Sequence, residues 1–209
     1  MDWLYRLEQV LQTDLPGEVA HKDMIPYRPL TSQMLADATT YRDSSVAILL
    51  YVEEQCLKSV LIERPSYDGA HSGQMAFPGG KVDVTDENLV ATALREMHEE
   101  IGFYDSDIRL LGQLTKVFIP VSNFLVYPHV FFTTKTPVFK ADHREVKEIV
   151  PFRIDDILDQ QRLIRTTVET GTGMRMKNVP AFEIEKKNVW GATCLIMNEF
   201  RICLEKSNF

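Results

Sequence analysis

The sequence predicts an α+β fold, because segments with strand character alternate with segments of helical periodicity along its 209 residues. Two adjacent apolar, β-prone runs, 45–52 and 57–63, are joined by three polar residues and predict a hairpin. Residues 88–101 instead repeat apolar side chains every three or four positions, as does the C-terminal stretch 189–205. We therefore expect helices packed against a sheet in one globular domain.

The first forty residues predict a helix followed by an extended arm. The apolar side of a helix over residues 3–12 consists of Trp3, Leu4, Leu7, Val10 and Leu11. Prolines at positions 16, 26 and 29 then interrupt regular structure, so this segment is either a connection or a dimer arm. We divide the chain into an N-terminal helix and arm, 1–40, and a main domain, 41–209, and a homodimer is the assembly that such an arm allows.

The remaining elements follow the central helix. They are strands at 108–119, 124–134 and 145–150, a short helix at 153–160, a hairpin over 165–185 and the final helix at 189–205.

Composition and charge limit the classes of function. The hydrophobic content of 44% and charged content of 25% are ordinary for a soluble globular protein. The net charge of −7, without any basic run, argues against nucleic acid as a general partner. No apolar stretch reaches the ~20 residues of a membrane span, and the N-terminus does not resemble a signal peptide. The scattered Cys56, Cys194 and Cys203 lack metal-ligand spacing and predict free thiols in a reducing cytoplasm.

The central helix separates an apolar stripe from an acidic face. Residues of N-cap type precede it (Asp83, Thr85 and Asp86), and Gly102 is a typical stop. At about 100° per residue, an arc of about 60° holds Val90, Leu94, Met97 and Ile101. A separate arc of about 100° holds Glu96, Glu99 and Glu100. Glu100 borders the apolar stripe, so we expect its carboxylate at the edge of the core.

Three carboxylates on one helix face repel one another unless protons or a cation intervene, so their pKa values are expected to rise without metal. Mg²⁺ suits them because it prefers oxygen ligands and is usually held together with substrate phosphates. Arg95 is placed to pair with a carboxylate, and the Gly79-Gly80 pair allows close backbone approach to an anion. The competing interpretation is a solvated acidic face.

The segment from Gly80 to Phe103 resembles the signature of the Nudix hydrolases, which is Gly, five residues, Glu, seven residues, Arg-Glu-(apolar)-x-Glu-Glu-x-Gly-(apolar). The second half is matched by Arg95, Glu96, Met97, Glu99, Glu100, Gly102 and Phe103. The first half contains one extra residue. Counting back from Arg95 assigns the single Glu to Glu87, whereas counting forward from Gly80 assigns it to Asp86, and both assignments stay open.

The inserted residue resembles the coenzyme A pyrophosphatase branch of that family. This branch has an upstream block, Leu-Leu-Thr-x-Arg-Ser, three residues, Arg, three residues, Gly, three residues, Phe-Pro-Gly-Gly. The block is matched with its spacing at Arg64, Gly73 and Phe77-Pro78-Gly79-Gly80.

Departures from the block weaken the expectation of a phosphate-rich substrate tail. Pro65 replaces Ser, Gly69 replaces the second Arg, and Leu61-Ile62 corresponds only loosely to the start. Arg64 and His71 are the residues that we expect to compensate in part for the missing Arg.

The resemblance implies an α/β/α sandwich with a mixed sheet between helices and a loop–helix–loop signature. It also implies attack of metal-activated water on a diphosphate, with Mg²⁺ or Mn²⁺ as cofactor. The implied metal ligands are Glu96, Glu99, Glu100 and the carbonyl of Gly80. The implied catalytic residues are Arg95, Glu96, Glu99 and Glu100. The candidates for the general base are Glu99, Glu145 and Glu148.

Substrate contacts are expected from the upstream block and a later turn. The block contributes Arg64, His71, Gly73, Phe77 and Gly79. The stretch Ile119 to Asn123 resembles one that follows the signature in the coenzyme A branch, so Ser122 and Asn123 either bind phosphate or nucleotide, or form a turn. Trp190 is expected in the core at the start of the final helix.

These observations support three hypotheses. The first is hydrolysis of coenzyme A or its derivatives to 3′-phosphoadenosine 5′-phosphate and (acyl)phosphopantetheine. The second is a Nudix pyrophosphatase for ADP-ribose, a dinucleotide or a nucleoside triphosphate. The third is a regulator that binds a nucleotide without cleaving it, which is expected to lose the signature carboxylates that are present here.

Overall fold

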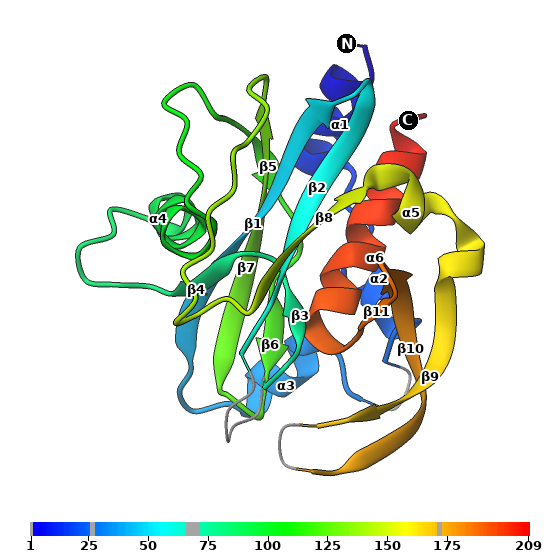
Figure 1. The fold of residues 1–209 in the computed structure, drawn as a ribbon. Helices are drawn as coiled ribbons and strands as arrows, with labels where there is room; N and C mark the ends of the chain where they lie inside the picture. Colours follow the sequence, from blue (N-terminus) through cyan, green and yellow to red (C-terminus); the bar gives the residue numbers. More distant parts are fainter. Residues whose placement is uncertain (1, 26–27, 66–71, 171–172) are drawn as a thin grey trace.

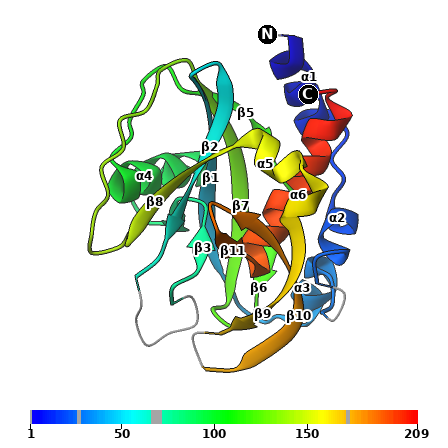
Figure 2. The same ribbon diagram turned by 45° about the vertical axis from the view of Figure 1, so that its right-hand side comes forward.

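The computed structural model describes residues 2–25, 28–65, 72–170 and 173–209. The predictions at Gly69 and His71 therefore lie outside the described residues. A mixed sheet forms the centre, with helix α4 (Leu89–Ile101) on one face and helices α1 (Asp2–Thr13) and α6 (Gly191–Lys206) on the other (Figure 1 and Figure 2). This arrangement confirms the predicted sandwich.

The main sheet brings distant strands together. Within the described residues its strands are β1 (Arg42–Glu53), β2 (Cys56–Glu63), β3 (Met75–Ala76), β4 (Gly79–Lys81), β5 (Arg109–Gln113), β6 (Val117–Ile119), β7 (Phe124–Thr133) and β8 (Glu148–Arg153). Strand β1 pairs in parallel with β7 and antiparallel with β2 and β4. The predicted β1–β2 hairpin is confirmed, and its turn residues Glu54 and Gln55 have left-handed φ values of 51° and 64°.

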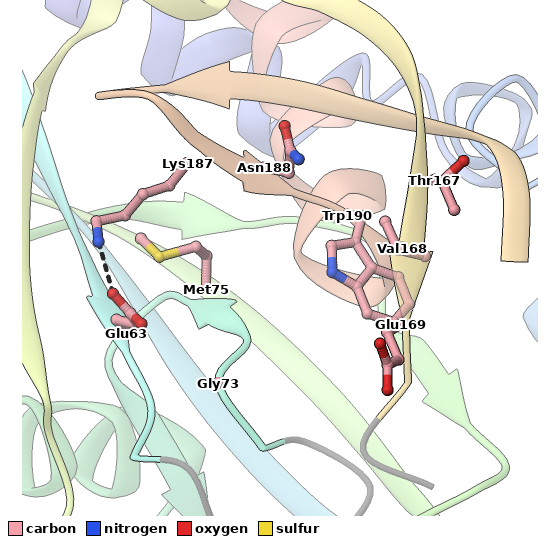
Figure 3. A pocket seen from close by; sticks show the side chains of 9 residues that line it. All are labelled: Glu63, Gly73, Met75, Thr167, Val168, Glu169, Lys187, Asn188 and Trp190. Atoms are coloured by element: carbon pink, nitrogen blue, oxygen red, sulfur yellow. Dashed lines mark hydrogen bonds and ion pairs between the residues drawn. The ribbon is translucent and has the colours of Figure 1, made fainter. Parts of the chain in front are cut away.

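A second, antiparallel sheet covers part of the α6 side. It consists of β9 (Leu163–Glu169), β10 (Arg175–Ile184) and β11 (Lys187–Val189), in which β9 and β10 form the predicted hairpin. Lys187 of β11 reaches the end of β2, where its Nζ lies 2.6 Å from a carboxylate oxygen of Glu63 (Figure 3). This ion pair joins the second sheet to the main one.

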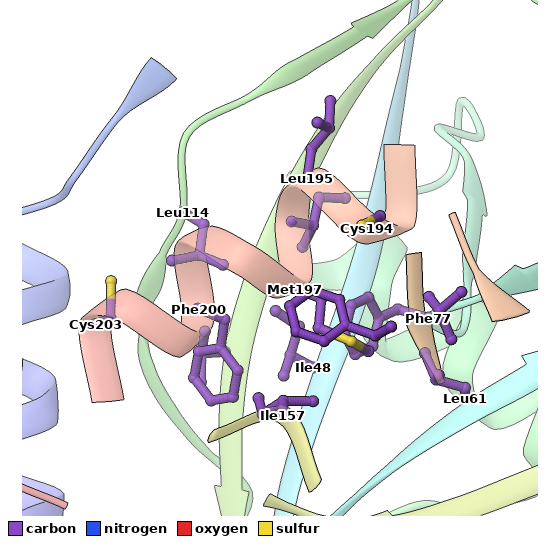
Figure 4. Close-up of a cluster of buried hydrophobic side chains, with 14 of the residues drawn as sticks. Ile48, Leu61, Phe77, Leu114, Ile157, Cys194, Leu195, Met197, Phe200 and Cys203 are labelled. Carbon is purple, nitrogen blue, oxygen red and sulfur yellow. The ribbon is translucent and has the colours of Figure 1, made fainter. Parts of the chain in front are cut away.

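Strand β1 is buried on both faces, which explains why its sequence is an almost continuous apolar run. Its Ala47, Leu49 and Tyr51 belong to the hydrophobic cluster under α4. Ile48 and Leu50 point the other way, into the larger cluster that contains the inner face of α6 (Figure 4). The alternation places the sheet between two cores.

The N-terminal arm is more regular than predicted. The predicted first helix is confirmed, with Leu4, Leu7 and Leu11 in the larger core, but two short helices follow it, α2 (Glu18–Lys22) and α3 (Thr31–Asp37). Pro16 and Pro29 stand outside both helices, so they interrupt the segment without preventing helical turns. The expectation of an extended arm is therefore wrong for 18–22 and 31–37.

The predicted strand over 108–119 is divided into β5 and β6. Between them, Thr115 donates its backbone N–H and its hydroxyl to the buried carboxylate of Glu199. The N–H of Thr115 is therefore not used in pairing with a neighbouring strand. The strand predicted to begin at residue 145 begins at Glu148 instead, because Glu145 and Val146 donate their N–H groups to the carbonyl of Asp142 in a turn.

The later helices agree with the prediction in outline. The predicted helix at 153–160 appears as α5 (Ile154–Leu158), followed by a 3₁₀ turn (Gln160–Arg162). None of the helices in the described part of the chain is long and apolar enough to span a bilayer.

Candidate active site

The signature helix has caps at both ends. The side chain of Asn88 accepts a hydrogen bond from the N–H of Ala91 at 2.9 Å, so Asn88 is the N-cap and the acidic residues before it form a turn. Gly102 ends the helix with a φ of 69°, and a β-carbon there would lie 2.9 Å from the carbonyl oxygen of Lys140. The apolar stripe faces the α4 core as predicted.

The glycine pair lies directly against the acidic face of the helix. The N–H of Gly79 donates to Oε2 of Glu100 at 2.8 Å. A β-carbon on Gly80 would overlap the carboxylate of Glu96, and one on Gly79 would overlap the backbone of Ser45 and Val46. Only glycine allows the loop and the carboxylates to approach this closely.

Three carboxylates converge beside this loop. Single oxygens of Glu96, Glu100 and Glu145 all lie within 4.8 Å of one another. The first two come from α4, whereas Glu145 comes from the turn before β8. Because neighbouring negative charges repel, this geometry calls for protons or a cation.

Burial raises the proton affinity of the two helix carboxylates. Glu100 is only 2% exposed, which is deeper than the core edge predicted for it. This burial raises the pKa of Glu100 to about 8, although Arg64 and the Gly79 N–H oppose the shift. Burial also raises the pKa of Glu96, against the effect of Arg95. The increase predicted for a metal-free cluster is therefore present at both residues.

The contacts of Arg95 distinguish between Asp86 and Glu87, the two candidates for the earlier acidic residue of the signature. Its guanidinium binds Asp86 through two hydrogen bonds, Nε–Oδ1 at 2.8 Å and Nη2–Oδ2 at 3.0 Å. The exposed Glu87 does not share this contact. Asp86, which also accepts from the Thr92 hydroxyl, is therefore the one of the two candidates that faces Arg95. The guanidinium holds the pKa of Asp86 well below its usual range.

Glu99 lies differently from the ligand position predicted for it. Its side chain is 52% exposed, and one oxygen accepts from Nη1 of Arg95 at 2.9 Å. The same nitrogen donates to Glu96 at 2.8 Å. Within the described residues, the converging group contains Glu145 in place of Glu99.

Ion pairs and a buried side chain hold the segment that carries Glu145. Val146 is fully buried in the α4 core. Lys147 donates its backbone N–H to the carbonyl of Glu63 at 2.9 Å, and its Nζ lies 2.5 Å from the Glu63 carboxylate. Glu148, another candidate base, instead pairs with Lys187 at 2.9 Å.

A cavity of about 580 Å³ opens over the carboxylates and contains several of the predicted substrate contacts. The predicted residues that line it are Arg64, Phe77, Gly79, Gly80 and Ser122. The hydroxyl of Ser122 is buried without a hydrogen-bond partner among the described residues. Arg64 donates to the Gly79 carbonyl at 3.2 Å and lies 3.9 Å from Glu100.

Two other predicted contacts are absent from the residues that line this cavity. Asn123 takes a left-handed φ of 55°, and its carbonyl accepts the N–H of Arg42, so its position fits the turn interpretation. Gly73 lines a smaller, neighbouring hollow.

Comparison with known proteins identifies the family. A model of the NUDIX domain matches residues 41–168. The chain belongs to the Nudix family. Members are hydrolases that act on nucleoside diphosphate-linked substrates, generally with divalent metal ions.

Relatives support the same Nudix assignment. The chain is 34% identical over 136 residues to a protein of Enterobacter sp. strain 638 named uncharacterized Nudix hydrolase NudL, which covers 65% of this chain and 70% of the relative. A protein of the same name from Salmonella newport strain SL254 is 30% identical over 177 residues, 84% of this chain and 90% of the relative. A solved MutT/nudix family protein from Enterococcus faecalis has a TM-score of 0.52 at 17% identity, covering 89% of this chain and 73% of that chain.

Part of the cavity wall lies outside the Nudix match and was missed in the sequence. Arg28 comes from the N-terminal segment, and its Nη2 donates to the carbonyl of Phe118 at 2.7 Å. Thr170 and Met174 come from the connection between β9 and β10, and Trp190 is the N-cap of α6. Trp190 is half-buried on the wall, which corrects the expectation of a core residue. No local motif marks these positions, because tertiary packing brings them to the site.

Proposed function

We propose that the protein hydrolyses the diphosphate of coenzyme A or its derivatives, giving 3′-phosphoadenosine 5′-phosphate and (acyl)phosphopantetheine. The observation that carries the catalytic part is the convergence of Glu96, Glu100 and Glu145 beside the Gly79-Gly80 loop, at the cavity wall. Carboxylates from two separate segments meet there at a separation that one cation can bridge.

The donor set fits Mg²⁺ or Mn²⁺. It consists of carboxylate oxygens, which both hard cations prefer, and burial has already raised the proton affinity of two of the three groups. Glu96, Glu100 and Glu145 would hold the metal, with the carbonyl of Gly80 as a further ligand. When bound, the metal would neutralise charge on the phosphates and lower the pKa of a bound water.

The remaining site residues orient this group and the substrate. We assign Arg95 to hold Asp86, Glu96 and Glu99 in place, because it donates to all three. Arg64 and Ser122 would contact the phosphates from the cavity wall. Glu99, Glu145 and Glu148 stay candidates for the general base, and Glu145 is the one of the three that lines the cavity.

The choice of coenzyme A rests on the inserted signature residue and the Phe77-Pro78-Gly79-Gly80 block. The cavity adds cationic side chains for a phosphate-rich nucleotide: Arg28, Arg64 and Lys81 line it. Arg28 thus supplies a guanidinium although Gly69 replaces the second Arg of the block. The departures at Pro65 and Gly69 favour, as the second candidate, ADP-ribose or a dinucleotide.

A substrate panel tests this proposal. Coenzyme A, ADP-ribose, a diadenosine polyphosphate and a nucleoside triphosphate would be incubated with Mg²⁺ and with Mn²⁺, and the products identified by mass spectrometry. We expect the highest kcat/KM with coenzyme A. A preference for ADP-ribose would reject the coenzyme A assignment and leave the hydrolase assignment intact, whereas nucleotide binding without any cleavage would support the regulator hypothesis. A cytoplasmic location and a homodimer stay predictions.

A further inference from the structure

A second hollow, of about 290 Å³, adjoins the catalytic cavity (Figure 3). Met75 and Trp190 line both spaces, so the two share a wall. The other sides of the hollow come from the end of β2, from Gly73, and from strands β9 and β11. The two spaces are therefore adjacent, with Met75 and Trp190 between them.

The size of the hollow suits part of a ligand. Small-molecule pockets usually measure about 300–1,000 Å³, which places the hollow at the lower limit and the catalytic cavity well inside the range. The hollow alone is small for a nucleotide, but it can hold a flexible chain attached to a group in the larger cavity.

The charges in the hollow disfavour an anion. Its cation, Lys187, is held by Glu63 at 2.6 Å and by Glu148 at 2.9 Å. Glu169 adds another carboxylate on the lining from β9. Carboxylates therefore outnumber the ammonium, and a phosphate would be repelled. The catalytic cavity also has carboxylates in its lining, but these form the converging group, and three cations accompany them, Arg28, Arg64 and Lys81.

The remaining surface suits a neutral chain with amide groups. Met75, Val168 and the indole of Trp190 supply apolar contacts. Asn188 and Thr167 also belong to the lining, and a side-chain amide and a hydroxyl are groups that can exchange hydrogen bonds with amides of a ligand. Figure 3 shows Thr167, Val168 and Trp190 on one side of the hollow, with Lys187 and Glu63 on the other.

We propose that this hollow binds the uncharged, amide-bearing arm of the substrate, while the nucleotide and its phosphates occupy the catalytic cavity. This inference rests on the proposed function, because it assigns the two ends of one diphosphate substrate to two adjoining spaces. It makes Thr167 and Asn188 specificity-determining residues outside the Nudix signature.

The test is to fill the hollow from its exposed side. Thr167→Trp places a bulky ring in the hollow from an exposed position on β9, and Asn188→Trp does so independently from β11. The control is Arg165→Trp, an exposed position on β9 that is absent from the lining. We expect both filling variants to raise KM for coenzyme A by about 10-fold and to leave KM for ADP-ribose, which lacks the arm, within about twofold. Equal effects on both substrates, or no effect in either filling variant, would overturn the proposal.

A binding measurement separates this proposal from the proposed function. Pantetheine, the arm without the nucleotide, would be titrated into the full chain and followed by NMR line shifts. Binding to the wild type and to Arg165→Trp, with loss in Thr167→Trp, would support the hollow as the arm site even if coenzyme A were not cleaved. Cleavage of coenzyme A without pantetheine binding, or with equal binding in all variants, would overturn the arm site and leave the hydrolase proposal standing.

Discussion

Helix α4 and the turn before β8 contribute carboxylates to the same group in different ways. On a capped helix, the half-buried Glu96 lies against Gly80 and the buried Glu100 accepts a hydrogen bond from Gly79. Glu145 is exposed on a turn that Val146 and the Lys147–Glu63 pair hold in place. The comparison shows that a local motif supplies the rigid half of the site, whereas tertiary contacts supply the other half.

The largest effect is expected on the helix side. Glu100→Gln removes a carboxylate from the converging group, so we expect kcat to fall by ~100-fold or more. The matched control is Glu87→Gln, which changes an exposed carboxylate outside the group. Steady-state kinetics with Mg²⁺ measure both, and near-normal turnover of Glu100→Gln would remove the helix from the mechanism.

The next prediction compares Glu99 with Glu145. Because Glu145 lies in the converging group and Glu99 pairs with Arg95, we expect Glu145→Gln to lower kcat by ~100-fold and Glu99→Gln by about 10-fold. Single-turnover kinetics at saturating metal would separate these effects from metal binding. The opposite order would restore Glu99 to the role that the signature predicts for it.

Metal binding is expected to depend on pH through Glu100. Its pKa is raised to about 8 from the model-compound value of 4.5, so between these values the folded, metal-free protein binds the extra proton. The free energy of unfolding contributed by this group therefore decreases as pH rises through that window. Because the proton competes with the cation, Mg²⁺ should bind more tightly as pH rises towards 8.

Thermal melting measures this pH dependence. The increase in Tm caused by Mg²⁺ should be larger at about pH 8.5 than at about pH 6, and Glu100→Gln should flatten the difference. A wild-type response that does not change over this interval would contradict the linkage.

The smallest effect is expected on the tethers of the turn. Glu63→Gln weakens the contacts to Lys147 and Lys187, so Glu145 should be held less firmly, and the Mg²⁺ concentration for half-maximal rate should rise about threefold. Glu53→Gln is the control, because it removes the Lys58–Glu53 ion pair at the other end of β2. Equal behaviour of the two variants would show that the turn does not need the Glu63 contacts.

The features that could be predicted from the sequence are those that depend on residues close to one another in the chain. The α4 stripe, its Gly102 stop and the β1–β2 hairpin follow from periods and turn chemistry within a few positions. Whether Asp86 or Glu87 faces Arg95 required side-chain directions, which counting does not provide. The convergence of Glu145 with Glu96 required the packing of segments almost fifty residues apart. Arg28 carries no motif and Trp190 was expected in the core, so their place in the cavity could be known only from the fold.

The N-terminal segment supplies hydrogen-bond partners to the buried Glu199, so removing that segment would affect the environment of this carboxylate. This fully buried carboxylate accepts hydrogen bonds from the Gly17 N–H and from Thr115, and lies 3.0 Å from Nε2 of His21. Deleting residues 1–40 would leave this buried carboxylate, among the contacts between described residues, with those from Thr115 alone, beside the apolar surface that α1 now covers. The N-terminal segment is thus part of the structure that surrounds Glu199, and not a removable extension.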